Sequence, residues 1–350
     1  MKEKKEYPPV YYSEYLALDK ILNAQEPVSA KYGVKADDEM LFIIVHQSYE
    51  LWFKQILYEL GLVHEIFSKS TLSDNDSDVY NIVHKLRRVG AILNLLVDQM
   101  GIIETMTPLD FLDFRDFLSP ASGFQSIQFK QVEAILGLKY ESRHGQSYYL
   151  SQLSEEDRNS VLEFEGKRSV IELLNDWLER MPFSVEEKYW KAYSEFPTHP
   201  FFNTYRKAYA DSLSPKEEGN LAHFDRVFYE GNEEDNTGSL SPAAKRNALF
   251  IMLYRDYPLL QLPFELLSQL LEVDHQLSMW RYRHVNMVKR MIGNRIGTGG
   301  SSGADYLKAA ADKHNIFGEL SLLTSFLMPR SELPGLPKEL VNDLSFRHSE

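Results

Sequence analysis

The chain has no cysteine among its 350 residues. Disulfide bonds, zinc–thiolate sites, cysteine-held iron–sulfur clusters and thioether-linked cofactors all require cysteine and are therefore excluded. Positive charge is also in short supply, since 38 Lys and Arg face 51 Asp and Glu and the net charge is -13. Because a nucleic-acid surface must offer a cationic face to the phosphates, we expect no nucleic-acid partner.

Long apolar runs are missing as well. The run Ile92–Met100 is interrupted by Asp98, so no segment reaches the length of a membrane-spanning helix, and we expect no membrane partner. The first residues, MKEKKEYPPVYYSEY, are charged and lack the apolar stretch of a signal peptide. Metal motifs of the HExxH and EF-hand types are absent, as is a phosphate-binding glycine loop. Together with the absence of cysteine, these features predict a soluble cytoplasmic protein.

What the sequence does contain is helical periodicity, while alternating strand patterns are scarce. The clearest helix is expected at 36–68, where Phe42, His46 and Phe53 belong to one apolar stripe. Thr107-Pro108 predicts the capped start of a short helix that ends near residue 118, and Pro263 predicts the start of a long one. Further helices are expected at 77–105, from 125, and at 154–181, 183–195, 200–213, 216–229, 242–256, 263–292, 304–315 and 317–328. The predicted fold class is all-α.

The predicted helices group into one large bundle-like domain and a smaller helical subdomain. We expect the core at 36–150 and 236–350, with a helical insertion at 151–235 and a separate N-terminal segment at 1–35. The stretch 231–241, rich in Asn, Glu, Asp and Gly, predicts a surface loop.

Two of the ten histidines stand in unusual surroundings. His46 lies one turn after Phe42 on the apolar stripe, where a core histidine satisfied by a hydrogen bond is the commoner interpretation. His284 lies in WRYRHVNMVKR, close to Arg281 and Arg283. This segment fits a solvated basic helix end, or a neutral imidazole bound to haem iron with cations nearby for the carboxylates of haem. The residues alone leave both alternatives open.

Two further clusters can be interpreted either as ordinary structural features or as functional sites. Arg115 lies one turn after Phe111, so the pair could clamp a carboxylate beside a flat apolar group, although an ion pair with a neighbouring aspartate is the simpler alternative. The stretch GTGGSSG (297–303) exposes backbone N–H groups and the hydroxyl of Thr298. It suits close approach to a ligand or serves as a flexible connector.

Taken together, these segments resemble the tryptophan 2,3-dioxygenase family. The family's distal-histidine helix is similar to DEMLFIIVHQSYELWFKQILYEL (38–60), and its substrate-carboxylate segment to ETMTPLDFLDFRDFLSPASGFQSIQF (104–129). Its proximal-ligand helix and active-site loop are similar to WRYRHVNMVKRMIGNRIGTGGSSGADYL (280–307). Weaker similarity, as in YLALDKILNAQ (15–25), extends over most of the chain. A match of this length, in the same order, is far more specific than a short motif.

The resemblance implies a cofactor, a reaction and an assembly. The cofactor is haem b (iron protoporphyrin IX), ferrous in the active state and held without covalent attachment. The reaction inserts dioxygen across indole C2–C3 of L-tryptophan and gives N-formyl-L-kynurenine, the first step of tryptophan catabolism through kynurenine. L-tryptophan and O2 are therefore the expected partners, together with further copies of the chain in a homotetramer built as a dimer of dimers.

The resemblance also implies a role for each site residue. His284 is the axial ligand of the haem iron, and His46, on the distal side, accepts a hydrogen bond from the indole N–H as a base or only as an orienting group. Arg115 pairs with the substrate carboxylate between the aromatic walls Phe42 and Phe111. The remaining implied contacts are those of Ser122 and Gly299 with haem, of Thr298 with the substrate, and of Tyr12 and Tyr15 with a neighbouring subunit's site.

The chain departs from the commoner members of the family at Ser48, Phe117 and Arg283, where alanine, tyrosine and a smaller polar residue are frequent. None of these changes removes a catalytic group, although Arg283 could alter the hydrogen bonds around the proximal ligand. Three alternatives stay open: a related haem oxygenase that acts on a modified indole or inserts one oxygen atom, a haem-binding sensor, and a helical protein without cofactor. The clamp formed by Arg115, Thr298 and Phe111 favours an enzyme over a sensor.

Overall fold

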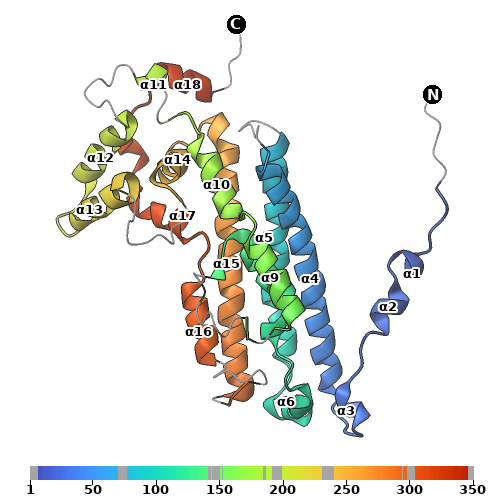
Figure 1. Cartoon of the computed structure of the whole chain (residues 1–350). Coiled ribbons are helices and arrows are strands. Elements are labelled where there is room, and N and C mark those ends of the chain that lie inside the picture. The colour runs from blue at the N-terminus through green and yellow to red at the C-terminus, as the bar shows by residue number, and fades with distance from the viewer. Residues whose placement is uncertain are drawn as a thin grey trace.

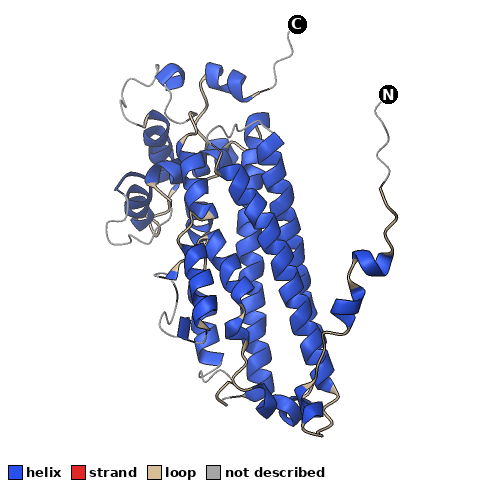
Figure 2. Cartoon of the chain, turned by 45° about the vertical axis from the view of Figure 1, so that its right-hand side comes forward, coloured by secondary structure: helices blue, strands red, loops and turns tan. Residues whose placement is uncertain are grey.

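Every regular element in the described part of the chain is helical, which confirms the all-α prediction (Figure 2). The computed structural model describes residues 7–69, 77–140, 143, 150–151, 153–183, 187–190, 199–230, 240–293, 295–297 and 304–345. Within these ranges no single helix is both long and apolar enough to cross a membrane. Only the bent pair Ser77–Ile103 and Pro108–Leu118, at 91°, meets the criterion by length and composition, and a buried core helix does so equally.

Three long helices lie side by side and form the body of the molecule (Figure 1). They are α4 (Asp38–Phe67), α5 (Ser77–Ile103) and α15 (Pro258–Ile292), with α5 packed against both of the others. In α4 the buried residues Val45, Tyr49, Phe53, Ile56 and Leu60 recur every three or four positions and therefore share one face. The helix predicted at 36–68 is thus confirmed to within two residues at either end.

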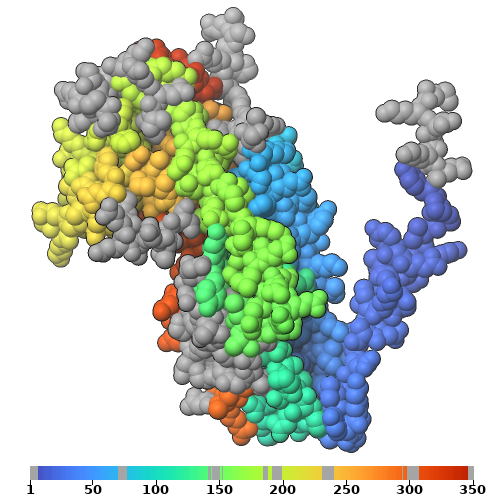
Figure 3. Space-filling model, in the orientation of Figure 1, coloured from blue at the N-terminus to red at the C-terminus, as the bar shows by residue number. Residues whose placement is uncertain are grey.

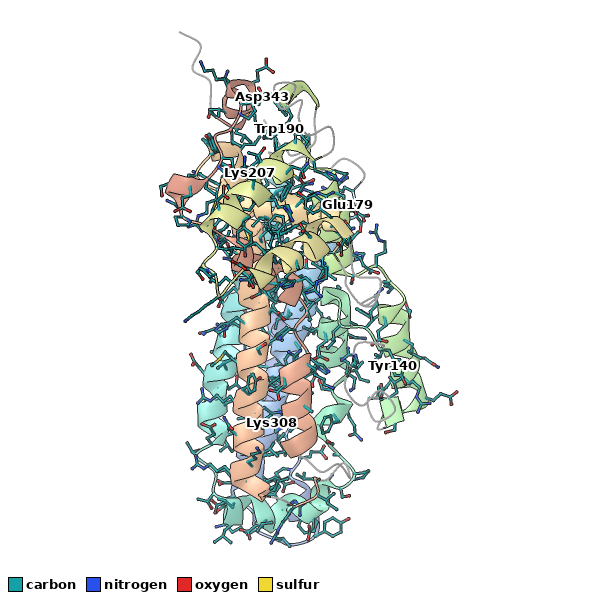
Figure 4. All side chains as sticks on the ribbon, turned by 90° about the vertical axis from the view of Figure 1, so that its left-hand side faces the viewer. Tyr140, Glu179, Trp190, Lys207, Lys308 and Asp343 are labelled. Carbon is teal, nitrogen blue, oxygen red and sulfur yellow. The ribbon has the colours of Figure 1, made fainter. Side chains whose placement is uncertain are left out.

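Shorter helices cover this body. The helix α7 (Ile127–Leu136) packs on α4, α9 (Glu155–Glu165) packs on α7, and α16 (Ala304–Lys313) packs on α15. In Figure 4, Lys308 marks α16 beside α15. The helix α10 (Val170–Glu179) joins α4 to α14 (Pro242–Leu253).

An aromatic lobe caps one end of the bundle. Its elements are α11 (Glu187–Trp190), α12 (Pro200–Ser212), α13 (Gly219–Asp225), η4 (Arg226–Glu230), α17 (Gly318–Leu322), η5 (Leu323–Phe326), η6 (Arg330–Glu332) and α18 (Lys338–Leu344). The Tyr189 hydroxyl donates to Asp343 at 2.8 Å, which joins α11 to α18 near the labels Trp190 and Asp343 in Figure 4. The buried side chains of the lobe belong to the same hydrophobic core as the bundle. The domain boundaries read from the sequence stay a prediction.

Two of the predicted helices differ clearly in their limits from the structure. The stretch 154–181 is not one helix, because α9 ends at Glu165 and Ser169 caps the start of α10 with a capping box to Glu172. The long C-terminal helix begins at Pro258, so Pro263 lies inside it rather than at its start. Both errors have a local cause: Ser169 caps a second helix inside the first stretch, and Pro258, not Pro263, takes the first helical position of the long helix.

The N-terminal segment stands away from the body (Figures 1 and 3). Its helices are α1 (Tyr12–Tyr15), α2 (Leu18–Leu22) and α3 (Val28–Lys31), and neither α1 nor α2 contains a buried residue. The segment joins the bundle at α3, where the carboxylate of Glu39 accepts hydrogen bonds from the backbone N–H groups of Val28 and Ser29.

Candidate functional site

A cavity of about 310 Å³ is lined by residues of α4, α5, α6 (Pro108–Arg115), α7, α15 and α16. In Figure 1, α6 lies at the end of the bundle opposite the aromatic lobe. This volume lies in the range of pockets that take small molecules. Six residues with an expected role in the site line the cavity: Phe42, His46, Phe111, Arg115, Ser122 and His284. The chain therefore brings together residues that are up to 242 positions apart (284 − 42).

Aromatic rings form one wall of the cavity. The ring of Phe42 lies with its centroid 4.0 Å from that of His46 and 5.9 Å from that of Phe111. Phe42 and Phe111 pack against a small buried cluster of Met106, Phe114 and Met291. The wall is aromatic and largely apolar, which suits an aromatic ring system.

Arg115 reaches the cavity from the last turn of α6 (Pro108–Arg115). The helix begins where the sequence predicted it, since Thr107 and Asp110 form a capping box and Pro108 takes the first helical position. One turn of 3-10 helix, η1 (Asp116–Leu118), follows. The guanidinium of Arg115 donates to the backbone carbonyl of Ile296, next to the glycine-rich stretch. The ion pair with a neighbouring aspartate, the simpler alternative, is not found among the described residues.

His46 presents a hydrogen-bond acceptor to the cavity. Its Nδ1 lies 2.7 Å from the Phe42 carbonyl oxygen. Because a carbonyl can only accept, Nδ1 carries the proton and Nε2 is left as an acceptor. Solvent reaches the ring through the cavity, but protein atoms surround it. This burial lowers the pKa of His46, while the Phe42 carbonyl and the charge of Glu50 oppose the shift.

His284 lies across the same cavity on α15. Its ring centroid is 5.2 Å from that of Trp280, one turn earlier, in a stacked arrangement. Burial, with a smaller contribution from the charge of His46, lowers the pKa of His284 to about 4. Among the described residues its ring nitrogens have no hydrogen-bond partner. His284 therefore offers a neutral imidazole, the form that binds iron.

Comparison with known proteins identifies the family. The family model described as Tryptophan 2,3-dioxygenase matches residues 2–327. The chain belongs to the tryptophan 2,3-dioxygenase family. A tryptophan 2,3-dioxygenase of Bdellovibrio bacteriovorus is 44% identical over 98% of this chain and 99% of that protein. One of Alteromonas mediterranea is 44% identical over 98% and 99%. One of Rattus norvegicus is 39% identical over 92% of this chain and 83% of that protein.

Four residues expected in the site of a tryptophan 2,3-dioxygenase are not placed in the cavity. Thr298 and Gly299 lie outside the described residues. Tyr12 and Tyr15 are 75% and 78% exposed on α1 and do not line the cavity of their own chain. Ser122 lines the cavity and also accepts from the Phe124 N–H as the cap of η2 (Gly123–Gln125).

From the sequence, the cations near His284 are expected to be available to the carboxylates of haem, but most of them do not face the cavity. Arg283 points away from the cavity, where it donates to the Val97 carbonyl at 2.9 Å and to Glu104 at 3.2 Å. It therefore joins α15 to α5. Lys289 and Arg290 are exposed and do not line the cavity. Of the Lys and Arg side chains in the segment 280–290, Arg281 alone lines it.

Sequence reasoning missed a buried charged cluster in the cavity wall. Its members are Lys130, Glu133, Arg143, Arg281 and His314, each no more than 6% exposed. Burial lowers the pKa of Lys130 to about 8, against the charge of Glu133. The only signal in the sequence is the spacing of Lys130 and Glu133, which places them on one face of α7 with buried residues.

Proposed function

We propose that this chain is a haem-dependent enzyme that inserts both atoms of dioxygen across indole C2–C3 of L-tryptophan and forms N-formyl-L-kynurenine. The observation that carries the proposal is the arrangement of one cavity. A neutral His284, an aromatic wall and the guanidinium of Arg115 all face the same space. Both oxygen atoms enter the product, so the reaction consumes no external reductant.

The residues around the cavity fit haem. His284 would hold the iron through its neutral imidazole, without help from a cysteine. Haem also carries two carboxylates. The cavity wall offers a cluster with three cationic side chains, Lys130, Arg143 and Arg281, and one carboxylate, Glu133, so positive charge is in excess there. Bound ferrous haem supplies the redox chemistry that allows dioxygen to react with an indole.

The side chains on the opposite wall bind and orient the amino acid. Phe42 and Phe111 sandwich the flat indole against apolar surface, and Arg115 pairs with the carboxylate in a bidentate geometry. His46 Nε2 accepts a hydrogen bond from the indole N–H, since Nδ1 already donates to the Phe42 carbonyl. These contacts fix C2 and C3 relative to the oxygen, and this orientation lowers the entropic cost of the reaction.

We extend the proposal to the remaining expected contacts. Ser122 would lie beside haem on the distal side, and Gly299 would contact it as well. Thr298 would bind the ammonium or carboxylate of the substrate.

The proposed assembly is a homotetramer built as a dimer of dimers. The arm formed by α1 and α2 stands away from its own body and exposes tyrosines to solvent, so it is available to a neighbouring subunit. In this assembly Tyr12 and Tyr15 would complete the substrate site of that neighbour.

An optical experiment tests the function. Ferrous, haem-loaded protein is prepared without oxygen and then given air and L-tryptophan. A Soret band followed by growth of the near-ultraviolet band of N-formylkynurenine, with a product mass higher by two oxygen atoms, is the expected result. A mass gain of one oxygen atom would favour a related oxygenase instead. A Soret band with no product from L-tryptophan or from substituted indoles would favour a sensor, and a colourless protein that takes up no haem would overturn the proposal.

A further inference from the structure

One buried carboxylate in the cavity wall contacts basic side chains from three separate segments. Glu133 on α7 accepts a hydrogen bond from Arg281 on α15 at 2.7 Å through Oε1, and one from Arg143 through Oε2. The Nδ1 atom of His314, just after α16, lies 4.0 Å from the same Oε1. The four residues are between 4% and 6% exposed and all line the cavity.

The carboxylate of Glu133 is charged in the folded protein. Burial alone would raise its pKa, but the charges of Arg143 and Arg281, with that of His314, outweigh burial and lower the pKa of Glu133 to about 2. Within the described residues, Glu133 is the one carboxylate within ion-pair distance of Arg281.

The same contacts connect Glu133 to the turn that carries His284. Arg281 lies three residues before His284 on α15, and its Nη1 donates to the His314 carbonyl at 2.7 Å. Two turns earlier, Asp274 accepts from the backbone N–H groups of Ile316 and Phe317. The His284 turn, the end of α16 and α7 are therefore joined through Arg281 and Glu133.

The charge of Glu133 also matters for whatever the cavity holds. Among the described lining residues, the cations Arg115, Lys130, Arg143 and Arg281 face the carboxylates Glu50 and Glu133. Loss of the Glu133 charge would make the wall more positive by one unit. Glu133 is buried, so its charge is weakly screened, and added positive charge at this place favours the ferrous over the ferric form of an iron centre nearby.

We propose that Glu133 is a positioning residue for the haem centre, which holds Arg281 and the His284 turn of α15 and keeps the reduction potential of bound haem low. This inference rests on the proposed haem-dependent function.

The test compares charge variants of the haem-loaded protein by spectroelectrochemical titration. Glu133→Gln is expected to shift the midpoint potential to more positive values. Arg143→Met, which removes a cation from the same cluster, is expected to shift it to more negative values. The double variant Glu133→Gln/Arg143→Met restores the charge balance and is expected to return close to the wild-type potential.

A matched control is Glu59→Gln. Glu59 is 1% exposed and binds Arg88 and Lys85, but it does not line the cavity. This variant is expected to keep the wild-type potential, so a shift as large as that of Glu133→Gln would overturn the proposal. Shifts of the same sign in Glu133→Gln and Arg143→Met would also overturn it.

The outcomes separate this inference from the proposed function. If the wild type binds haem and forms product while Glu133→Gln keeps the wild-type potential, the role of Glu133 is wrong and the function stands. If the wild type binds no haem, the function itself fails. Should Glu133→Gln not fold, Arg143→Met and the charge-balanced double variant still decide, because the first must fall below the wild-type potential and the second must match it.

Discussion

The guanidinium of Arg115 donates to the backbone carbonyl of Ile296, a residue 181 positions further along the chain. This bond ties the end of α6 to the residue that precedes the glycine-rich stretch. It also leaves the Arg115 side chain in the cavity wall, where its remaining N–H groups can meet a carboxylate. Arg115 is thus held in place by its own chain before substrate arrives, which reduces the entropic cost of binding.

Replacement of Arg115 by alanine should weaken use of L-tryptophan and leave haem content unchanged. A hydrogen bond to a charged group contributes about 1.5–3 kcal/mol, so kcat/KM should fall roughly 10- to 100-fold, mainly through KM. Arg115→Lys keeps the charge but not the bidentate fork, and we expect it to recover only part of the loss. Arg168→Ala, at an exposed arginine paired with Asp176, is the control. A wild-type KM in Arg115→Ala would disprove the carboxylate contact.

His284→Ala should yield folded protein with little or no haem, because the variant lacks the nitrogen that would hold the iron. The control His275→Ala lies on the same helix but is exposed and outside the cavity, and it should load haem normally. The measurement is a Soret titration at equal protein concentration, with helicity followed by circular dichroism. Full haem loading and an unchanged ferrous spectrum in His284→Ala would rule out its role as ligand.

His46→Ala should slow L-tryptophan more than 1-methyl-tryptophan, which has no indole N–H. A neutral hydrogen bond contributes about 0.5–1.5 kcal/mol, so its loss alone predicts a roughly 2- to 10-fold decrease in kcat/KM. A larger decrease, on the order of 100-fold or more, would indicate proton transfer as well. Steady-state rates with both substrates decide, and equal losses with the two would count against a contact between His46 and the indole N–H.

The lowered pKa of His284 predicts how the stability of haem-free protein depends on pH. The unfolded chain takes up a proton near pH 6.5, whereas burial holds the pKa of His284 in the folded state at about 4. As pH falls from 6.5 to 4, protonation therefore favours unfolding, by an amount on the order of a few kcal/mol. His284→Leu should flatten this part of the denaturation profile, and His275→Leu should not. An equal slope in wild type and His284→Leu would contradict the assigned burial.

The sequence predicted what depends on neighbours along the chain. The apolar stripe of α4 set that helix to within two residues, and Thr107-Pro108 marked the start of α6. The single helix predicted at 154–181 is wrong, because Ser169 caps a second helix inside a stretch whose apolar periodicity continues across the break.

The charged cluster could not be predicted in this way. Glu133 and Arg281 are 148 residues apart, and their ion pair exists only because α7 and α15 meet at the cavity. Apolar periodicity shows which face of a helix is buried, but not which buried charges will face one another. The family resemblance predicted that His46, His284 and Arg115 share one site. Their spacing in the sequence alone did not decide this.

The exposed arm gives a prediction about assembly. Tyr12 and Tyr15 are expected to act in a neighbouring subunit, so a variant with both replaced by alanine should bind haem but turn over L-tryptophan slowly. A second chain, His284→Ala, has an intact arm but cannot hold haem. Tyr80→Ala, at an exposed tyrosine on α5, is the control for loss of a surface ring.

Co-expression of the two defective chains with different tags shows whether the arm acts in the site of its own chain or in that of a neighbour. If the arm reaches a neighbour, the intact arm of the His284→Ala chain completes a haem-containing site of the other, and mixed oligomers recover activity that neither chain shows alone. If the arm serves its own chain, each site in a mixed oligomer lacks either a functional arm or haem, and the oligomer stays inactive. Activity of doubly tagged, purified oligomers therefore determines whether Tyr12 and Tyr15 belong to the site of their own subunit or to that of the next.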